Sequence, residues 1–415
     1  MEEELRRREF LGLGVGLGAT IAAGGLCGWD LRQAMAEPLE RLAQNIPSVV
    51  LGRTKWGSKI VGLGTIFRPE GPWTDKESNA VIGMLIENGI NLIETSAVYG
   101  DAEERVGNAL RPFKRDKVFL VAKSTKVTRE RFLRQFEATL AKLQTDYVDC
   151  LMLHNYSTFI EFDRVMGQGG AFEALLQVQK EGKARFVGLS GHGCQVTMSA
   201  LRSGKFDLFV IPFNAAHREF DRALALAAKL GAGTLIMKPF GGSGLLKYND
   251  KDPLQVPESL TVSDCLRYVL SHPGARVAIP NMSTPEHVKG VLAAAATFRP
   301  LSAEEKKAIE AKGSRIRAGV CAECPKPCDA ACPGRIPISV IMSNVQDLHR
   351  IGYNHRRMGD EYQVLEHDFM DCDGCGECEK ACPKKLAIRK ELEHFEKTVR
   401  ENRFTDILMF EKMYR

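Results

Sequence analysis

The chain has 415 residues, of which 44% are hydrophobic and 26% are charged, and its formal net charge is +5. This composition is typical of a globular protein that has room for one large core and a smaller module. The small net charge and the lack of a basic patch interleaved with aromatic residues argue against nucleic acid as a partner.

The first 36 residues have the pattern of an export signal. The stretch "RRREFLGLGVGLGATIAAGG" places arginines, with Arg7 and Arg8 as the twin pair, before an acid-free apolar run. Ala34 and Ala36 supply small residues at an A-x-A cleavage position. We predict that residues 1–36 are a twin-arginine signal and that the protein works in the periplasm or on the outer face of the cytoplasmic membrane. If the signal stays uncleaved, it is the only expected membrane contact.

Residues 49–300 alternate short apolar runs with amphipathic helical stretches. The apolar runs are continuous, which is typical of parallel strands buried on both faces. Eight strands are predicted, at residues 59–65, 91–96, 118–124, 147–155, 184–191, 208–214, 233–239 and 276–280. Eight strand–helix units over about 250 residues predict an α/β protein of the (β/α)8 barrel type. A doubly wound sheet is disfavoured because no G-x-G-x-x-G turn follows any strand.

Four polar residues stand at or just after predicted strand ends, where barrel enzymes place their catalytic groups. They are Glu94, Tyr99, Lys123 and His154. A carbonyl that receives a hydride develops alkoxide charge, so an acid such as Tyr99 must supply a proton. Lys123 would stabilise the ionised tyrosine, and Glu94 would keep the lysine charged and oriented. His154 would hydrogen-bond the carbonyl oxygen.

In these segments the chain resembles the aldo-keto reductase family. "NLIETSAVYGDAEERVGNAL" is similar to that family's Asp…Tyr-Gly segment, and "VAKS" and "MLHN" are similar to its Lys and His strands. The resemblance implies a barrel oxidoreductase that acts on a small carbonyl or alcohol substrate with NAD(P)(H) as cofactor. The chain departs from the family at Glu94, where the family has aspartate.

The resemblance also implies where the nicotinamide would bind. It places the contacts to the amide at a Ser-Asn pair and a glutamine, and this chain has Ser190-Gly191 and Val210 at those positions. Phe213 is the aromatic residue expected to stack on the nicotinamide ring.

The rest of the nucleotide is expected near the last two strands. Where the family's NADP-binding members carry Lys and Arg for the 2′-phosphate, this chain has Asn281 and His287, so no preference for NADP is expected. The glycine-rich stretch that contains Lys238, Gly242 and Gly244 is predicted to cradle a pyrophosphate with its backbone.

A charged linker helix at residues 301–319 leads to a cysteine-rich module at 320–390 and a charged helical tail at 391–415. Two C-x2-C starts, each ending in Cys-Pro, predict a ferredoxin-type module with [4Fe–4S] clusters. The cysteines are Cys321, Cys324, Cys328 and Cys332 in the first group and Cys372, Cys375, Cys378 and Cys382 in the second.

In two-cluster ferredoxins the fourth cysteine of each group ligates the other cluster, so Cys332 would join the second group and Cys382 the first. The first group has one residue more between its second and third members than the ferredoxin pattern. Two alternatives therefore stay open. One is a single cluster with a broken or zinc-filled first site, and the other is a set of disulfides.

The two halves handle electrons in different numbers, because nicotinamide moves two at once and a cluster moves one. Three interpretations follow. The clusters exchange electrons with a redox partner protein, or they are purely structural on an ordinary NAD(P)H-dependent reductase. In the third, the barrel is non-catalytic and the protein is an electron-transfer or interaction module.

Overall fold

The computed structural model describes residues 39–66, 74–241, 244–246, 259–318, 321, 326–351, 362 and 365–413. The predicted signal at residues 1–36 lies outside these residues. Within the part of the chain that is described, no helix is long and apolar enough to cross a membrane.

Eight parallel strands form one curled sheet in the order in which they follow along the chain. The strands are β3 (Leu63–Gly64), β4 (Leu92–Glu94), β5 (Phe119–Ser124), β6 (Val148–His154), β7 (Ala184–Ser190), β8 (Leu208–Pro212), β9 (Gly233–Met237) and β10 (Val277–Ala278). Bridges from Val61 to Ala278 and from Gly64 to Asn281 join the first strand to the last. The sheet is therefore a (β/α)8-type barrel, as the eight apolar runs predict.

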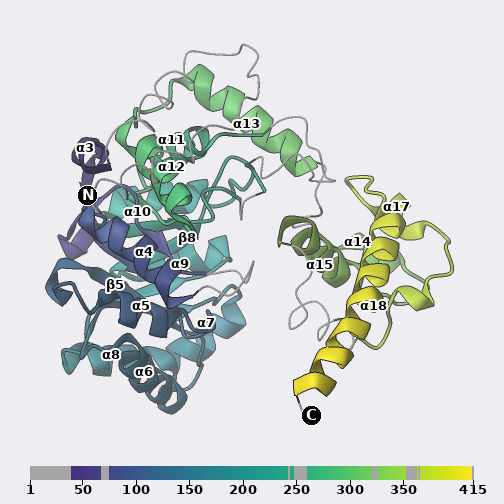
Figure 1. Ribbon diagram of the computed structural model, residues 1–415, viewed down its shortest axis with the longest axis horizontal. Helices are drawn as coiled ribbons and strands as arrows, with labels where there is room; N and C mark the ends of the chain where they lie inside the picture. Colours follow the sequence, from purple (N-terminus) through teal and green to yellow (C-terminus); the bar gives the residue numbers. More distant parts are fainter. Residues whose placement is uncertain are drawn as a thin grey trace, which may run out of the picture.

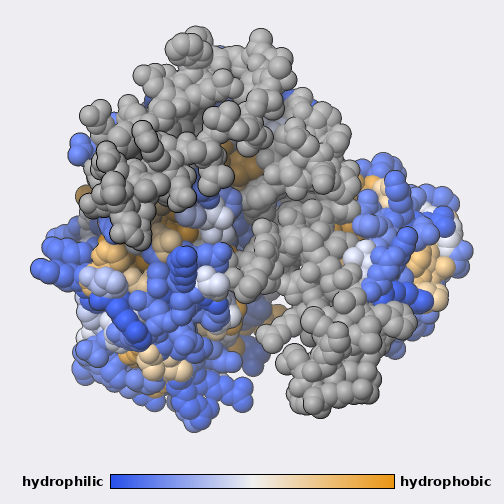
Figure 2. All heavy atoms as spheres, viewed as in Figure 1, coloured by the Kyte–Doolittle hydropathy of each residue, from blue (hydrophilic) through white to orange (hydrophobic). Residues whose placement is uncertain are grey.

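Helices cover the outside of this sheet (Figure 1). They are α4 (Asp75–Glu87), α5 (Ala102–Leu110), α6 (Arg129–Leu143), α7 (Phe159–Met166), α8 (Ala171–Lys180), α9 (Cys194–Ser203), α10 (Asp221–Leu230), α11 (Val262–Leu270) and α12 (Pro285–Ala296). Each presents an apolar stripe to the strands, and in α6 that stripe includes the buried Phe132, Phe136 and Leu140. Figure 2 shows mainly hydrophilic residues on the outer surface of the barrel, as expected for amphipathic helices.

Both faces of the strands are buried, which explains why the sequence shows continuous apolar runs. Residues that face the helices, such as Leu120 and Leu151, belong to the large core between sheet and helices. Residues of the other parity, such as Val121 and Met152, fill the barrel interior. The interior is therefore a packed core, and any site must lie at its ends.

A short hairpin closes the N-terminal end of the barrel. It consists of α3 (Leu39–Asn45) followed by β1 (Ser48–Val50), the short helix η1 (Gly52–Thr54) and β2 (Gly57–Lys59). Leu51 is fully buried among the interior residues, and a side chain at Gly52 would come within 2.1 Å of the Gly233 nitrogen. This contact leaves only the C-terminal end of the barrel for a site.

After the barrel, α13 (Ala303–Ala318) occupies the predicted linker and packs on α11. Beyond it, α14 (Pro327–Ala331), α15 (Ile338–Ile351), α17 (Glu377–Ala381) and α18 (Ile388–Met413) form a group beside the barrel (Figure 1). Their apolar residues form a separate core that includes Cys328, Cys378 and Cys382. The predicted boundary at residue 391 falls inside α18, whose first half packs into this core through Leu392 and Phe395.

Candidate functional site

Three of the four predicted catalytic side chains meet inside the C-terminal end of the barrel. Glu94 ends β4 and Lys123 lies in β5. Both occupy the alternate strand positions whose side chains point into the barrel interior. The Lys123 side chain is 1% exposed, and its Nζ contacts the Glu94 carboxylate and donates a hydrogen bond to the Tyr99 hydroxyl at 2.9 Å. This ammonium also lies 4.6 Å from the centre of the Tyr99 ring.

Burial dominates the electrostatics of this trio. It raises the pKa of Tyr99 well above its ordinary value, so the hydroxyl holds its proton at neutral pH. It also lowers the pKa of Lys123, and the Glu94 carboxylate in direct contact opposes that shift. The arrangement is a buried acid with a cation positioned to stabilise its conjugate base.

His154, the last residue of β6, completes the set. Its ring stands perpendicular to the Tyr99 ring, with 5.6 Å between ring centres. Burial and the neighbouring Lys123 and His192 lower its pKa to about 2, so the imidazole is neutral. Its Nδ1 lies 2.8 Å from the Ser96 Oγ. The structure thus brings together the four residues named from the sequence.

The loop that follows β7 leaves no room for an amide-binding side chain at position 191. Ser190 is 2% exposed and lies beside His154 in the sheet register. A Cβ at Gly191 would lie 2.5 Å from the Tyr156 carbonyl oxygen. At the position of the family's glutamine, Val210 lies in the barrel interior. Of the three side chains that the resemblance implies for binding the nicotinamide amide, this chain therefore keeps only Ser190.

Phe213, the predicted stacking residue, does not line the barrel opening. It is 1% exposed, and its ring stacks on Tyr268 of α11 with 5.6 Å between centres. Phe213 follows Phe209 and Ile211 at every second position of the strand, and these residues face the helices. The structure places Phe213 in the core between sheet and helices.

Asn281 and His287 have structural partners in this fold. The Asn281 side chain donates to the Ile66 carbonyl across the barrel seam, and the His287 Nδ1 accepts from the Ser283 amide at the start of α12. The acidic Glu286 occupies the first turn of the same helix. Since a carboxylate repels a phosphate, these residues do not fit a 2′-phosphate.

Part of the predicted pyrophosphate cradle can be placed. Lys238 follows β9 in the left-handed backbone region, with φ of 56°, and its carbonyl accepts from the buried Asn214 side chain. Gly244 forms a turn with Gly241, while Gly242 lies outside the described residues. Seven described non-glycine residues share this backbone region, so it does not by itself identify Lys238 as a ligand contact.

Four further residues at this end of the barrel were not predicted. Ser96 bonds His154, and His192 follows β7, where the surrounding protein and the neighbouring Lys238 lower its pKa to about 4. The hydroxyls of Thr65 and Thr95 are buried and have no hydrogen-bond partner among the described residues. Along their strands these threonines follow Leu63 and Ile93, whose side chains face the helices, so they do not point toward the catalytic set. A short polar residue just after a strand was the only sequence signal for them.

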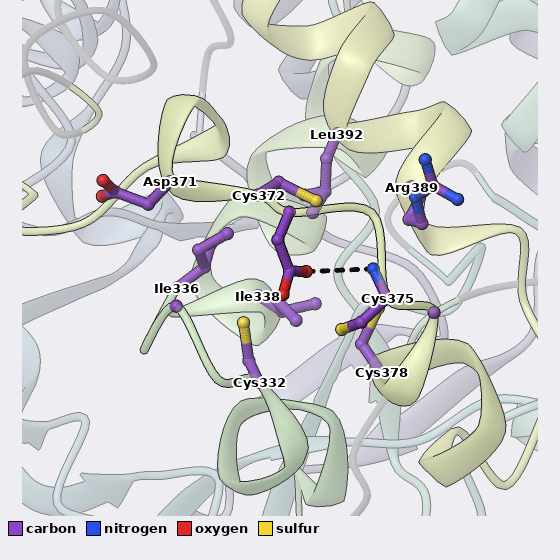
Figure 3. Close-up of a pocket in the computed structure, with 12 residues that line it drawn as sticks. Cys332, Ile336, Ile338, Asp371, Cys372, Cys375, Cys378, Arg389 and Leu392 are labelled. Carbon is purple, nitrogen blue, oxygen red and sulfur yellow. Dashed lines mark hydrogen bonds between the residues drawn. The ribbon is translucent and has the colours of Figure 1, made fainter.

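The second group of cysteines lines a pocket in the C-terminal module (Figure 3). Cys372, Cys375 and Cys378 share it with Cys332, which comes from the first group. The remaining lining residues include Ile336 and Leu392. Burial raises the pKa of the Cys378 thiol, and Cys332 and Cys372 raise it further as neighbours. The pocket therefore gathers the four thiols that the crossed pairing predicts, in a partly apolar setting.

The two groups are built alike, and from the third cysteine onward corresponding residues are 50 positions apart. Asp329, next to Cys328, accepts from the Ser339 amide at the start of α15. Glu379, next to Cys378, accepts from the Arg389 amide at the start of α18 in the same way. Arg335 and Lys385 both adopt a positive φ after the Cys-Pro step. The module is a structural repeat.

None of the ten cysteines that the structure describes forms a disulfide. Cys150 and Cys265 are buried apolar packing residues, as expected for isolated cysteines. Across the described ranges no three His, Cys, Asp or Glu side chains are placed to hold a single metal ion. Cys324 lies outside the described residues, so the first group cannot be assembled in full.

Comparison with known proteins gives a match to a family model. Residues 60–265 match the Aldo/keto reductase family. The chain is 29% identical to the methylglyoxal reductase YeaE of Escherichia coli over 253 residues, which are 55% of this chain and 82% of that protein. It is 26% identical to the aldo-keto reductase YhdN of Bacillus subtilis over 41% of this chain, and spans 54% of the length of that relative.

Among solved structures, an aldo-keto reductase from Klebsiella pneumoniae in complex with NADPH is similar to this chain. The TM-score is 0.53 and the identity is 27%, over 65% of this chain and 95% of that one. The family match ends at residue 265, before α13 and the cysteine module begin.

Proposed function

We propose that the chain is an oxidoreductase that interconverts a small carbonyl compound and its alcohol, in keeping with the match of residues 60–265 to the Aldo/keto reductase family. The hydrogen bond of 2.9 Å from the buried Lys123 to Tyr99, together with the contact of the same ammonium with Glu94, carries this proposal. This general type of reaction agrees with the name of the E. coli relative, a methylglyoxal reductase.

Tyr99 is the proton donor in this scheme. Because burial raises its pKa, the hydroxyl is protonated when the carbonyl arrives and can transfer its proton to the developing alkoxide. The resulting tyrosinate is stabilised by the Lys123 ammonium, and Glu94 keeps that ammonium in place. The neutral His154, whose ring stands edge to face with Tyr99, orients the carbonyl oxygen.

A nicotinamide cofactor bound at this end of the barrel would supply the hydride, two electrons at once. The lack of space at Gly191 and the carboxylate of Glu286 predict a loose hold on the amide and no selectivity for NADPH over NADH.

We further propose that the repeated cysteine groups hold two [4Fe–4S] clusters that exchange electrons with a partner protein. The support is the pocket that Cys332 shares with Cys372, Cys375 and Cys378. By the 50-residue repeat, Cys382 would join the first group. Two clusters would hold two electrons in total, the number needed for one carbonyl.

The proposed location is outside the cytoplasm, through the predicted twin-arginine signal. That route carries folded proteins, so clusters inserted in the cytoplasm would survive transit. Free nicotinamide is not supplied there, and an exported reductase of this type should retain its nucleotide or take electrons through the clusters.

Turnover by Tyr99→Phe tests the barrel chemistry. Purified protein is incubated with a carbonyl panel and with NADH, NADPH or reduced ferredoxin as donor. The variant should lose about 10²- to 10⁴-fold in rate, the usual contribution of a general acid. Tyr147→Phe is the matched control, because Tyr147 lies just before β6, at the closed end of the barrel. Equal turnover by Tyr99→Phe and wild type would remove Tyr99 as the proton donor.

Iron and acid-labile sulfide test the clusters separately. Protein prepared without oxygen should contain about eight irons per chain, and Cys375→Ser should lower that number while Cys150→Ser should not. Release of nicotinamide or flavin on denaturation would identify the two-electron carrier. Protein without iron and sulfide would rule out the clusters and leave the barrel chemistry untouched.

A further inference from the structure

We propose that Ser96 is a positioning residue that fixes His154 as the tautomer protonated on Nε2, so that the histidine donates a hydrogen bond to the substrate oxygen. The inference deepens the proposed function, because it assigns the direction of one hydrogen bond in the same site. It concerns a residue that lies two positions after Glu94 and was not among the predicted catalytic set.

Ser96 is fully buried between the ends of two strands. Its Oγ lies 2.8 Å from the His154 Nδ1 and 3.3 Å from the Lys123 carbonyl oxygen. The Val98 amide points at the same oxygen from 3.4 Å. The hydroxyl therefore has two candidate acceptors for its single proton.

The distances decide between them. Hydrogen bonds donated by hydroxyls span about 2.5–3.0 Å, so the contact with Nδ1 fits and the contact with the carbonyl is too long. The Lys123 carbonyl is also approached by the Ala97 amide at 3.3 Å. Ser96 thus donates to Nδ1, which must then be the unprotonated nitrogen.

The one proton of a neutral imidazole must consequently sit on Nε2. The neighbours of the ring support the neutral form, since the charged groups acting on it are Lys123 and His192, both of which disfavour a second positive charge. Tyr99 adds an aromatic edge and no charge at neutral pH. No carboxylate contributes to the shift of this histidine.

The tautomer determines what the substrate meets. With Nε2 protonated, His154 and Tyr99 both offer hydrogen-bond donors to a carbonyl oxygen that gains negative charge. With Nδ1 protonated, the histidine would present a lone pair to the same oxygen and repel it. Ser96 therefore acts through His154 and need not touch the substrate.

Nitrogen-15 spectra of histidine-labelled protein test the proposal directly. Wild type should show His154, assigned by its loss in His154→Gln, with a protonated Nε2 and an unprotonated Nδ1. Ser96→Ala should shift these two signals toward the other tautomer, and Ser96→Thr, which keeps the hydroxyl, should restore them. Ser124→Ala is the matched control, because Ser124 is a buried strand-end serine that bonds Gln135 instead.

The variants that change the His154 signals should also change the catalytic rate. Ser96→Ala should lower kcat about 10²-fold, the usual loss for one donor to a developing oxyanion, with a smaller change in KM. A protonated Nδ1 in wild type, or unchanged His154 signals in Ser96→Ala, would overturn the proposal. Confirmed spectra with no turnover by wild type on any carbonyl would instead contradict the proposed function and leave the tautomer assignment standing.

Discussion

Replacing Lys123 with methionine should destabilise the barrel by about 3–5 kcal/mol, the usual cost of leaving a buried charge without its partner. The Lys123 and Glu94 side chains are 1% and 5% exposed, so water cannot replace the lost ammonium. Methionine keeps most of the side-chain volume, which limits any cavity contribution. For a domain of about 250 residues, this loss corresponds to a melting temperature lower by about 6–20 °C.

Calorimetry of the full chain measures the effect, with cluster absorbance reporting the cysteine module separately. Lys183→Met is the matched control, since Lys183 pairs with Glu137 at 2.6 Å on the surface, where both side chains are more than a third exposed. An exposed pair contributes at most about 1 kcal/mol. The Lys123→Met, Glu94→Gln double variant removes both charges and should recover most of the stability without recovering turnover.

Two results would refute this reasoning. One is a melting temperature of Lys123→Met that equals that of Lys183→Met. The other is a double variant as unstable as the single one. Either would mean that the Glu94 carboxylate is not held as a buried anion by Lys123, and the support proposed for the Tyr99 tyrosinate would fall with it.

Three further predictions concern other residues of the two sites. Since the pKa of His154 falls to about 2 in the folded chain and is about 6.5 when unfolded, the unfolded chain binds more protons between these values. Stability should therefore drop by about 1.4 kcal/mol per pH unit below pH about 6.5, and equal urea profiles for wild type and His154→Gln would contradict this. Gly191→Ala should cost about 1–3 kcal/mol because the new Cβ meets the Tyr156 backbone, and a variant as stable as wild type would exclude that contact. Arg389 lines the cysteine pocket where the repeat has Ser339, so in a redox titration followed by EPR, Arg389→Ser should lower one cluster potential and not both.

The barrel could be predicted from the sequence because parallel strands buried on both faces give continuous apolar runs. All eight strands lie within or at the predicted ranges. All eight are shorter than predicted, and the first and last have only two residues each, since these two strands meet only through isolated bridges such as Val61 to Ala278. Glu94, Tyr99, Lys123 and His154 could be predicted because a barrel has only one end at which strand-end residues converge.

The cofactor contacts could not be predicted in the same way, because they depend on how loops pack. The Tyr156 carbonyl and Gly191 lie close together although their loops follow different strands, and no local sequence pattern predicts this contact. Phe213 is an instructive exception. The period of two along β8 puts Val210 inside the barrel and Phe209, Ile211 and Phe213 on the helix side, so parity alone would have excluded it from the opening.

The packing of the two halves bears on what the clusters would be for. Among the described residues, the barrel core draws Ile309 and Ile316 from α13 and nothing from residue 321 onward. The module has its own core, built around its cysteines and the apolar residues of α15 and α18. If the clusters served to attach the module to the barrel, the module and the barrel would be expected to share a core of apolar residues. Because the cores of the described residues are separate, clusters would stabilise the module that contains their cysteines and not the barrel. We therefore propose that any contribution of clusters to the chemistry of the barrel would be made through electrons.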